Sequence, residues 1–177
     1  MKKDIKQLIN SLNFYFDKTH YVIKKKRNLN SLEKTLIYNA EKYKDRINTI
    51  QELYSSKKTR VKLDHRDYEL VACSIAAKGL KYASFGTSHR LLPPNSYVKA
   101  TRILLRPLGE IGKKSSQTTS TNIVGKCAEI KAVNNIYSVE PKLIATDISF
   151  TKAIRPRTME KISRCENCTY IFGDENK

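Results

Sequence analysis

The stretch that decides the fold is residues 125–137, which read Gly-Lys-Cys-Ala-Glu-Ile-Lys-Ala-Val-Asn-Asn-Ile-Tyr. Its small and apolar residues recur at helical spacing and so lie on one face of a helix. These residues are Ala128, Ala132, Val133 and Ile136. Residues 143–150, which read Leu-Ile-Ala-Thr-Asp-Ile-Ser-Phe, are apolar enough for a buried strand. This part of the chain therefore predicts a helix followed by a strand.

Two cysteine motifs flank this predicted helix and strand. A Cys-Ala-Glu begins at Cys127, and a Cys-x-x-Cys comprises Cys165 and Cys168. Three thiols can supply three ligands to a tetrahedral zinc ion and leave the fourth position to water, which is the layout of a catalytic site. Glu129 follows the first thiol by two residues, and it is placed to accept a proton and deliver it to a leaving amine. The motifs therefore predict an open zinc site with its own acid and base.

Three thiolates would give the site a negative first shell, which calls for compensating positive charge. Both cysteine motifs are predicted to begin helices, and the amides at a helix start stabilise a thiolate. Lys126 and Arg164 directly precede Cys127 and Cys165. The sequence thus contains the compensation that such a site needs.

The order of a Cys-x-Glu helix, a strand and a Cys-x-x-Cys helix resembles the signature of the zinc-dependent cytidine deaminase superfamily. Arg155-Pro156-Arg157 leading to the Cys-x-x-Cys is most similar to the YwqJ-like bacterial toxin deaminases. The resemblance covers roughly residues 97–172, and the family's usual proline before the Cys-x-x-Cys is Arg164 here. It implies that zinc is bound by three thiols and that a glutamate moves protons. The residues that match are Cys127, Cys165 and Cys168 for the metal and Glu129 for the proton transfer.

The whole chain is predicted to be an α/β protein with a cytidine deaminase-like helix-sheet-helix core, built on a small mixed sheet and preceded by an N-terminal helical hairpin. The hairpin is expected in residues 1–58 and the zinc domain in residues 61–177. In the hairpin we expect a helix near 4–26 and a second one after the polar cap at Asn30, with apolar residues four and three apart from Leu36 to Tyr54. In the zinc domain we expect a helix over 67–82, a β-hairpin with strands at 97–106 and 118–124, a helix over 125–137, a strand over 143–150 and a short last helix.

Composition and charge narrow the choice of partner. The chain has 177 residues, of which 40% are hydrophobic, which allows a core and argues against disorder throughout. The 34 Lys and Arg outnumber the 17 Asp and Glu, and the net charge of +17 attracts polyanions. DNA, RNA or an acidic protein is therefore the expected partner. With no run of 18 apolar residues, no membrane partner is expected, and we expect the protein in the cytoplasm or, as an exported effector, in a recipient cell's cytosol.

These features together predict a deaminase that converts cytosine to uracil in nucleic acid with Zn²⁺ as cofactor. Polar residues before the cysteine motifs are candidates for reading an extruded base. These candidates are Thr119, Thr121, Asn122 and Ser163. The resemblance to toxin deaminases further implies a bacterial toxin or effector and a dedicated acidic immunity protein.

Three other interpretations of the cysteines stay open. A structural zinc site would be closed by a histidine, and the chain offers His20, His65 and His89. A redox Cys-x-x-Cys would need neither Cys127 nor Glu129. A non-catalytic, zinc-stabilised basic module could bind nucleic acid through phosphate contacts alone.

Overall fold

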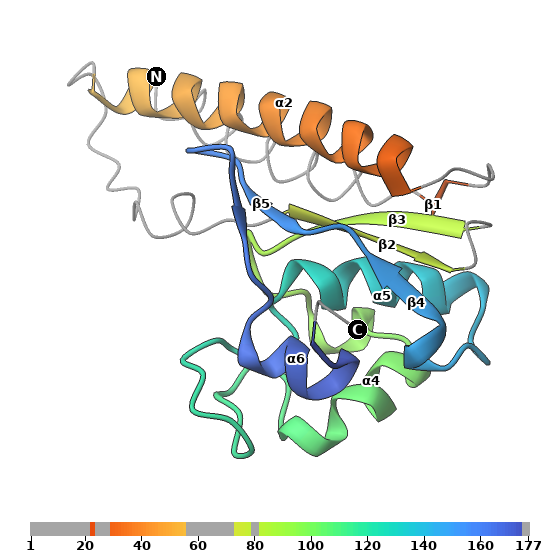
Figure 1. Cartoon of the computed structure of the whole chain (residues 1–177). Helices are drawn as coiled ribbons and strands as arrows, with labels where there is room; N and C mark the ends of the chain where they lie inside the picture. Colours follow the sequence, from red (N-terminus) through yellow and green to blue (C-terminus); the bar gives the residue numbers. More distant parts are fainter. Residues whose placement is uncertain (1–21, 24–28, 56–72, 79–81, 175–177) are drawn as a thin grey trace.

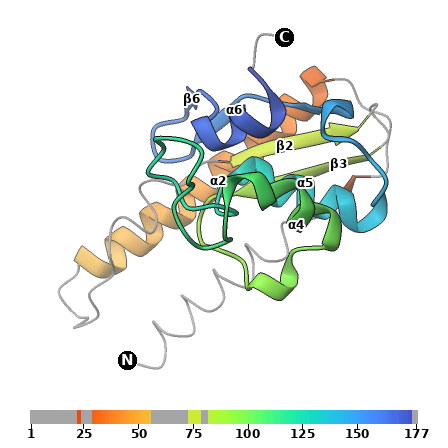
Figure 2. The ribbon, with the colours of Figure 1, turned by 90° about the horizontal axis from the view of Figure 1, so that it is seen from below.

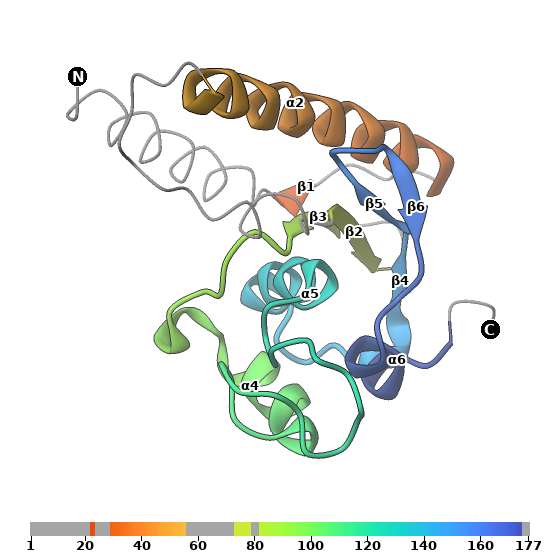
Figure 3. The same ribbon diagram turned by 90° about the vertical axis from the view of Figure 1, so that its left-hand side faces the viewer.

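The structure, a computed structural model of the chain, describes residues 22–23, 29–55, 73–78 and 82–174. A sheet lies between two helical layers (Figure 1). Helix α2 (Leu29–Ser55) covers one face, α5 (Ala128–Val139) covers the other, and α4 (Lys99–Leu105) and α6 (Glu166–Phe172) lie beyond α5 (Figure 3). This layering confirms the α/β class in its coarse form.

Helix α2 begins close to the expected cap, and its apolar spacing is matched by burial. Its buried side chains are Leu32, Leu36, Ala40, Tyr43 and Ile47. They face the sheet, where α2 contacts β2 (Cys73–Lys78) and β5 (Ala153–Arg155). Although α2 has 27 residues, no helix in the described part of the chain combines the length and hydrophobicity that a membrane span requires.

The first helix of the expected hairpin, over 4–26, falls mostly outside the described residues. Within that range the structure describes only β1 (Val22–Ile23), a short strand that pairs with β3 (Tyr82–Thr87). At these two residues the helical prediction is wrong, because the edge of β3 offers backbone hydrogen bonds that a two-residue strand can use.

The expected helix over 67–82 is also wrong, since its described residues form β2 and the first residue of β3. These strands pair antiparallel from Cys73 opposite Thr87 to Lys78 opposite Tyr82. On its other side β2 pairs with β4 (Ile148–Phe150) and with β5. Pairing on both sides satisfies the backbone of β2 as a central strand, and this outweighs the helical spacing of its apolar residues.

The strands follow the order β1-β3-β2-β5-β6, with β4 paired to β2 and with β6 (Glu160–Ile162) at the edge. Every pairing among the described strands is antiparallel, so the sheet is not mixed as predicted. The physical reason is that the chain passes over the face of the sheet in α5, and β4 and β5 then run in the direction opposite to β2. Figure 2 shows α5 lying along β2 and β3.

The β-hairpin expected at 97–106 and 118–124 is absent from the described residues. Residues 99–105 form α4, extended by a short 3-10 turn over Arg106–Leu108. Thr101, Leu105 and Leu108 are buried four and three residues apart, a helical period that the alternating pattern concealed. Residues 118–124 form no strand, and the loop that contains them has one isolated bridge, between Lys114 and Ile123.

The prediction of α5 is confirmed, and this helix packs very closely on the sheet. A Cβ placed on Gly86 of β3 would lie 2.0 Å from the Ala128 carbonyl oxygen, so only glycine allows this approach. The strand expected over 143–150 is shorter than predicted, because a 3-10 turn over Ala145–Asp147 precedes β4 and Ile144 is 60% exposed. Only the last residues of that apolar run join the sheet.

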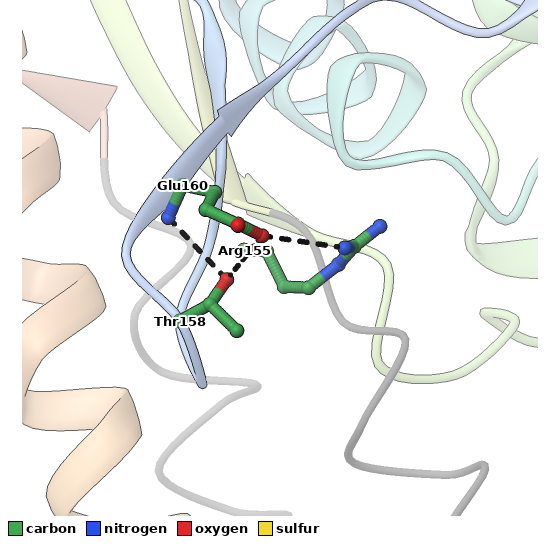
Figure 4. Close-up of polar contacts among 3 residues, drawn as sticks. All are labelled: Arg155, Thr158 and Glu160. Carbon is green, nitrogen blue, oxygen red and sulfur yellow. Dashed lines mark hydrogen bonds and ion pairs between the residues drawn. The ribbon is translucent and has the colours of Figure 1, made fainter.

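Strands β5 and β6 form a hairpin, and the Arg-Pro-Arg motif runs from the last residue of β5 into its turn. The Glu160 carboxylate lies 3.7 Å from the Arg155 guanidinium and accepts a hydrogen bond from the Thr158 hydroxyl at 2.8 Å (Figure 4). The Lys161 ammonium is 2.6 Å from the Glu33 carboxylate of α2. The motif thus belongs to a hairpin that reaches the α2 face of the sheet.

Candidate metal centre

Three cysteine side chains that are far apart in sequence meet between α5 and α6. Cys127 is the N-cap residue of α5, Cys165 is the N-cap residue of α6, and Cys168 lies in the first turn of α6. Their sulfur atoms all lie within 4.8 Å of one another, and the Sγ atoms of Cys127 and Cys165 are 3.3 Å apart. All three are free thiols. The structure therefore brings together the three residues predicted as metal ligands.

The fold explains why the cysteines converge. Helix α5 is fixed on the sheet, and β4 and β5 then run along β2 before the chain turns through β6 into α6. A hydrophobic cluster surrounds the thiols and joins α4, α5 and α6. Its buried members are Tyr97, Leu105, Leu108, Val124, Cys127, Ile130 and Cys168. The thiols consequently lie at the edge of a packed core, where water is largely excluded.

The donor set fits a soft metal ion such as zinc. In a tetrahedral site with zinc–sulfur bonds of about 2.3 Å, neighbouring sulfurs lie about 3.8 Å apart, which is between the 3.3 Å of Cys127 and Cys165 and the 4.8 Å within which all three sulfurs lie. No histidine of the described residues joins the cluster. His89 packs its ring against Tyr43 of α2 with centroids 6.2 Å apart, while His20 and His65 lie outside the described residues. The cluster thus offers three thiols and no fourth protein ligand from the described part of the chain.

A buried carboxylate stands beside the thiols. Glu129 is 7% exposed, and its Oε2 accepts a hydrogen bond from the Cys168 thiol at a sulfur–oxygen distance of 3.8 Å. Burial raises the pKa of Glu129 above its usual range, and the charge of Cys165 adds to the rise. Glu129 is not one of the clustered ligands. A carboxyl group in this position can hold a proton and release it to a neighbour.

The thiols perturb one another because they are close and shielded from water. Contacts with the Cys127 and Cys168 thiols lower the pKa of Cys165 to about 2. The same contacts, together with burial, raise the pKa values of Cys127 and Cys168. These shifts favour the thiolate form at Cys165 over the other two cysteines.

Arg164, which directly precedes Cys165, is anchored in the packing around α6. Its guanidinium lies 4.9 Å from the ring centroid of Phe150 and 5.9 Å from that of Phe172. It also donates a 2.6 Å hydrogen bond to the carbonyl of Gly173 at the end of α6. Its charge lowers the pKa of Glu129, against the larger effect of burial. The residue thus holds both ends of α6 while adding positive charge near the carboxylate.

Two of the residues predicted to bind substrate lie against α6. The Thr119 hydroxyl donates to the Glu166 carboxylate at 2.9 Å, and the Asn122 side chain hydrogen-bonds to Cys165, which helps to lower the pKa of that thiol. Thr121 lies between them and is exposed. Ser163 is exposed in the segment that joins β6 to Cys165. The structure therefore gives Thr119 and Asn122 partners within the protein.

Sequence analysis missed several polar side chains that shape the site. The buried Asn167 amide bonds to Thr118 and Asn122, and the Tyr97 hydroxyl donates to the Gly125 carbonyl at 2.9 Å. A further one is Lys131, which is buried in α5 and donates to the Arg90 carbonyl. The only sign of these residues in the sequence was Asn167, which lies between the two cysteines of the Cys-x-x-Cys. The motif accepts any residue at that position, so the asparagine did not stand out.

Comparison of the chain with protein-family models, with curated protein sequences and with solved structures finds no match. What the site can do must therefore be inferred from its own geometry. That geometry consists of three converging thiols, a buried carboxylate in contact with one of them, and a polar loop held against α6.

Proposed function

We propose that this protein is a zinc-dependent hydrolytic deaminase that converts cytosine to uracil in nucleic acid. In this proposal Cys127, Cys165 and Cys168 bind Zn²⁺, and Glu129 is the catalytic acid and base. One observation carries the proposal: the buried Glu129 carboxylate contacts the thiol cluster without belonging to it. A purely structural zinc site has no need of a desolvated carboxylate beside its ligands.

The order of elements supports a cytidine deaminase-like core. The Cys-x-Glu motif opens α5, β4 and β5 follow along the central strand, and the Cys-x-x-Cys opens α6. This is the helix, strand and helix order of the resembled superfamily, with both motifs at helix starts.

The chemistry divides between the metal and the carboxyl group. Zinc held by three thiolates would act as a Lewis acid that activates a water molecule. Glu129 takes a proton as the water oxygen forms a bond to C4 of cytosine, and it gives a proton to the exocyclic nitrogen as the C4–N bond breaks. Water is consumed and ammonia released, with no change of oxidation state. The raised pKa of Glu129 suits a group that must both accept and donate.

The charge of the chain favours a polyanionic substrate over a free nucleoside. A net charge of +17 attracts nucleic acid and raises its local concentration around the protein. The same charge would suit an acidic immunity protein if the protein is a bacterial toxin, as its resemblance to toxin deaminases suggests. Co-purification from cells that express the neighbouring genes tests that part of the proposal, and recovery of no acidic partner would count against it.

The direct test is to incubate the zinc-loaded full chain with single-stranded DNA, RNA, transfer RNA and free cytidine, and to detect uracil by sequencing or mass spectrometry. We expect Glu129→Gln to lower the rate by about 10³-fold, within the range for losing a general acid and base. The matched control is Glu33→Gln on α2, across the sheet from the site, which should keep the wild-type rate. Zinc content must be equal in all three proteins.

Two results would contradict the proposal. One is the absence of uracil from every substrate with zinc bound. The other is a Glu129→Gln variant as active as wild type. Nucleic-acid binding without conversion would favour the non-catalytic zinc-stabilised module, and in that case a fourth protein ligand should be found on the metal by X-ray absorption spectroscopy.

A further inference from the structure

A buried amide joins the Cys-x-x-Cys helix to the loop beside it. Asn167, between Cys165 and Cys168, is 2% exposed. Its Oδ1 accepts a 2.5 Å hydrogen bond from the Thr118 hydroxyl, and its Nδ2 donates a 3.0 Å hydrogen bond to the Asn122 carbonyl. Both ends of one side chain are thus used, and both partners lie in residues 118–122.

The same short segment has further ties to α6. The Thr119 hydroxyl donates to Glu166, and the Asn122 side chain bonds to Cys165. Within the segment, the backbone N–H of Asn122 donates a 3.2 Å hydrogen bond to the Ser120 hydroxyl, which closes a tight turn. We call residues 118–122 the wall segment, because they stand against the helix that carries two of the three thiols.

The position of Asn167 makes it the central tie of the wall segment. Its two hydrogen bonds hold the segment at both ends, at Thr118 and at Asn122. Between these ends the Ser120 side chain is half-buried and that of Thr121 is exposed. A buried amide with both polar ends satisfied resists displacement, since breaking either hydrogen bond would leave a desolvated group without a partner. Metal ligands on α6 and the wall segment consequently keep one relative position.

We infer that Asn167 is a positioning residue, which holds the wall segment where it contacts the substrate base next to the metal. This inference rests on the proposed function and deepens it. Asn167 does not touch the reacting atoms. It acts through the wall segment, so its loss should weaken substrate binding more than the chemical step.

The test compares zinc-loaded full-length Asn167→Ala and Thr118→Val with wild type. Thr118→Val removes one of the two hydrogen bonds with little change in shape. The matched control is Thr158→Val, which removes a threonine hydroxyl in the exposed turn between β5 and β6. Hydrogen exchange of the wall segment, zinc content, KM and kcat are measured for each.

For Asn167→Ala we expect exchange in the wall segment to rise about tenfold, as expected from losing one or two hydrogen bonds, with exchange in α5 unchanged. KM should rise about tenfold with kcat within about threefold of wild type. Thr118→Val should show the same pattern with smaller changes, and it decides the matter if Asn167→Ala fails to fold. Thr158→Val should match wild type.

Unchanged exchange in the wall segment of both variants would overturn the inference, as would an equal rise throughout α5, which indicates global destabilisation. Exchange requires no deaminase activity. If wild type is inactive on every substrate, the proposed function fails, and the exchange data still decide whether Asn167 holds the wall segment.

Discussion

Helices α5 and α6 start in the same way but are held in place differently. Each begins at a cysteine N-cap in extended backbone conformation, and neither cysteine side chain caps its helix. In α5 nine of the twelve residues are buried, including Glu129, Lys131 and Asn134. In α6 only Asn167 and Cys168 of the seven residues are buried. The first helix is part of the core, and the second is attached to it.

This difference indicates how the site is assembled. Helix α5 carries one thiol and the carboxylate, and it packs along β2 and β3 of the sheet. Helix α6 carries two thiols, and it is held by the thiol cluster, the wall segment, Arg164 and the packing of its Phe172 ring against Phe150. A metal ion would therefore complete the site mainly by fixing α6.

The largest effect is expected where α5 meets the sheet. In Gly86→Ala the new Cβ would meet the backbone of α5 at Ala128 and Ala132, at 2.0 and 2.7 Å, and a helix backbone cannot yield as a side chain can. We expect the free energy of unfolding in urea to fall by at least about 3 kcal/mol.

The matched control lies at the end of α6. A Cβ on Gly173 would meet nothing within 4 Å, so the cost of Gly173→Ala comes only from its backbone conformation, with φ +78° and ψ −177°, and should be about 1–3 kcal/mol. Equal losses for the two variants would mean that α5 is no more tightly held than α6, against the comparison above.

Removal of the metal should separate the two helices in a single experiment. Because α6 has few buried residues, chelation of zinc should speed its hydrogen exchange by about 100-fold, while α5 stays within about threefold of the loaded protein. Exchange measured by mass spectrometry before and after chelator gives both values. An equal increase in exchange in α5 and α6 would show that the metal stabilises the whole core. No change in α6 would show that its protein contacts are enough to hold it without the metal.

The same contrast explains which parts of the fold could be predicted from sequence. Helix α5 has a helical period of its own in Ala128, Ala132, Val133 and Ile136, but the fold also buries its polar positions, so burial covers nine of its twelve residues. Helix α6 has no comparable pattern, and it was predicted from the Cys-x-x-Cys alone. Strand β2 was not predicted because its conformation depends on pairing with strands on both sides. The residues of β2 alone do not indicate that pairing. Helix α4 was missed because residues 97–106 alternate as a strand would.

At the candidate site, the residues that carry the proposed chemistry could be predicted from sequence, but the hydrogen bonds that hold them in place could not. The three thiols and Glu129 were predicted because metal binding and proton transfer require particular residue types at particular spacings. The contacts between the wall segment and α6 join residues 43 to 49 positions apart, and threonine and asparagine are common in any loop. The polar residues at 118–124 suggested a strand, but the side chains of Thr118, Thr119 and Asn122 form hydrogen bonds with residues of α6 and its N-cap.

The smallest expected effect concerns the entry to α5. The Tyr97 hydroxyl is buried, donates to the Gly125 carbonyl and accepts a hydrogen bond from the Leu92 amide at 3.3 Å. Tyr97→Phe should lower the free energy of unfolding by about 1–2 kcal/mol at neutral pH, because two backbone groups lose their partner. The effect should be pH-dependent, since burial raises the pKa of Tyr97 to about 12.

In alkaline solution the unfolded chain ionises at Tyr97 near pH 10, whereas the folded chain keeps the proton until about pH 12. The folded state then binds more protons, so wild-type stability must fall as pH rises through this window, and Tyr97→Phe lacks this contribution. Urea denaturation of both proteins at pH 7, 10 and 11 should therefore show the difference in unfolding free energy shrinking above pH 10. A difference that stays constant would mean that the Tyr97 hydroxyl is accessible to water, and that the entry to α5 is as loosely held as α6.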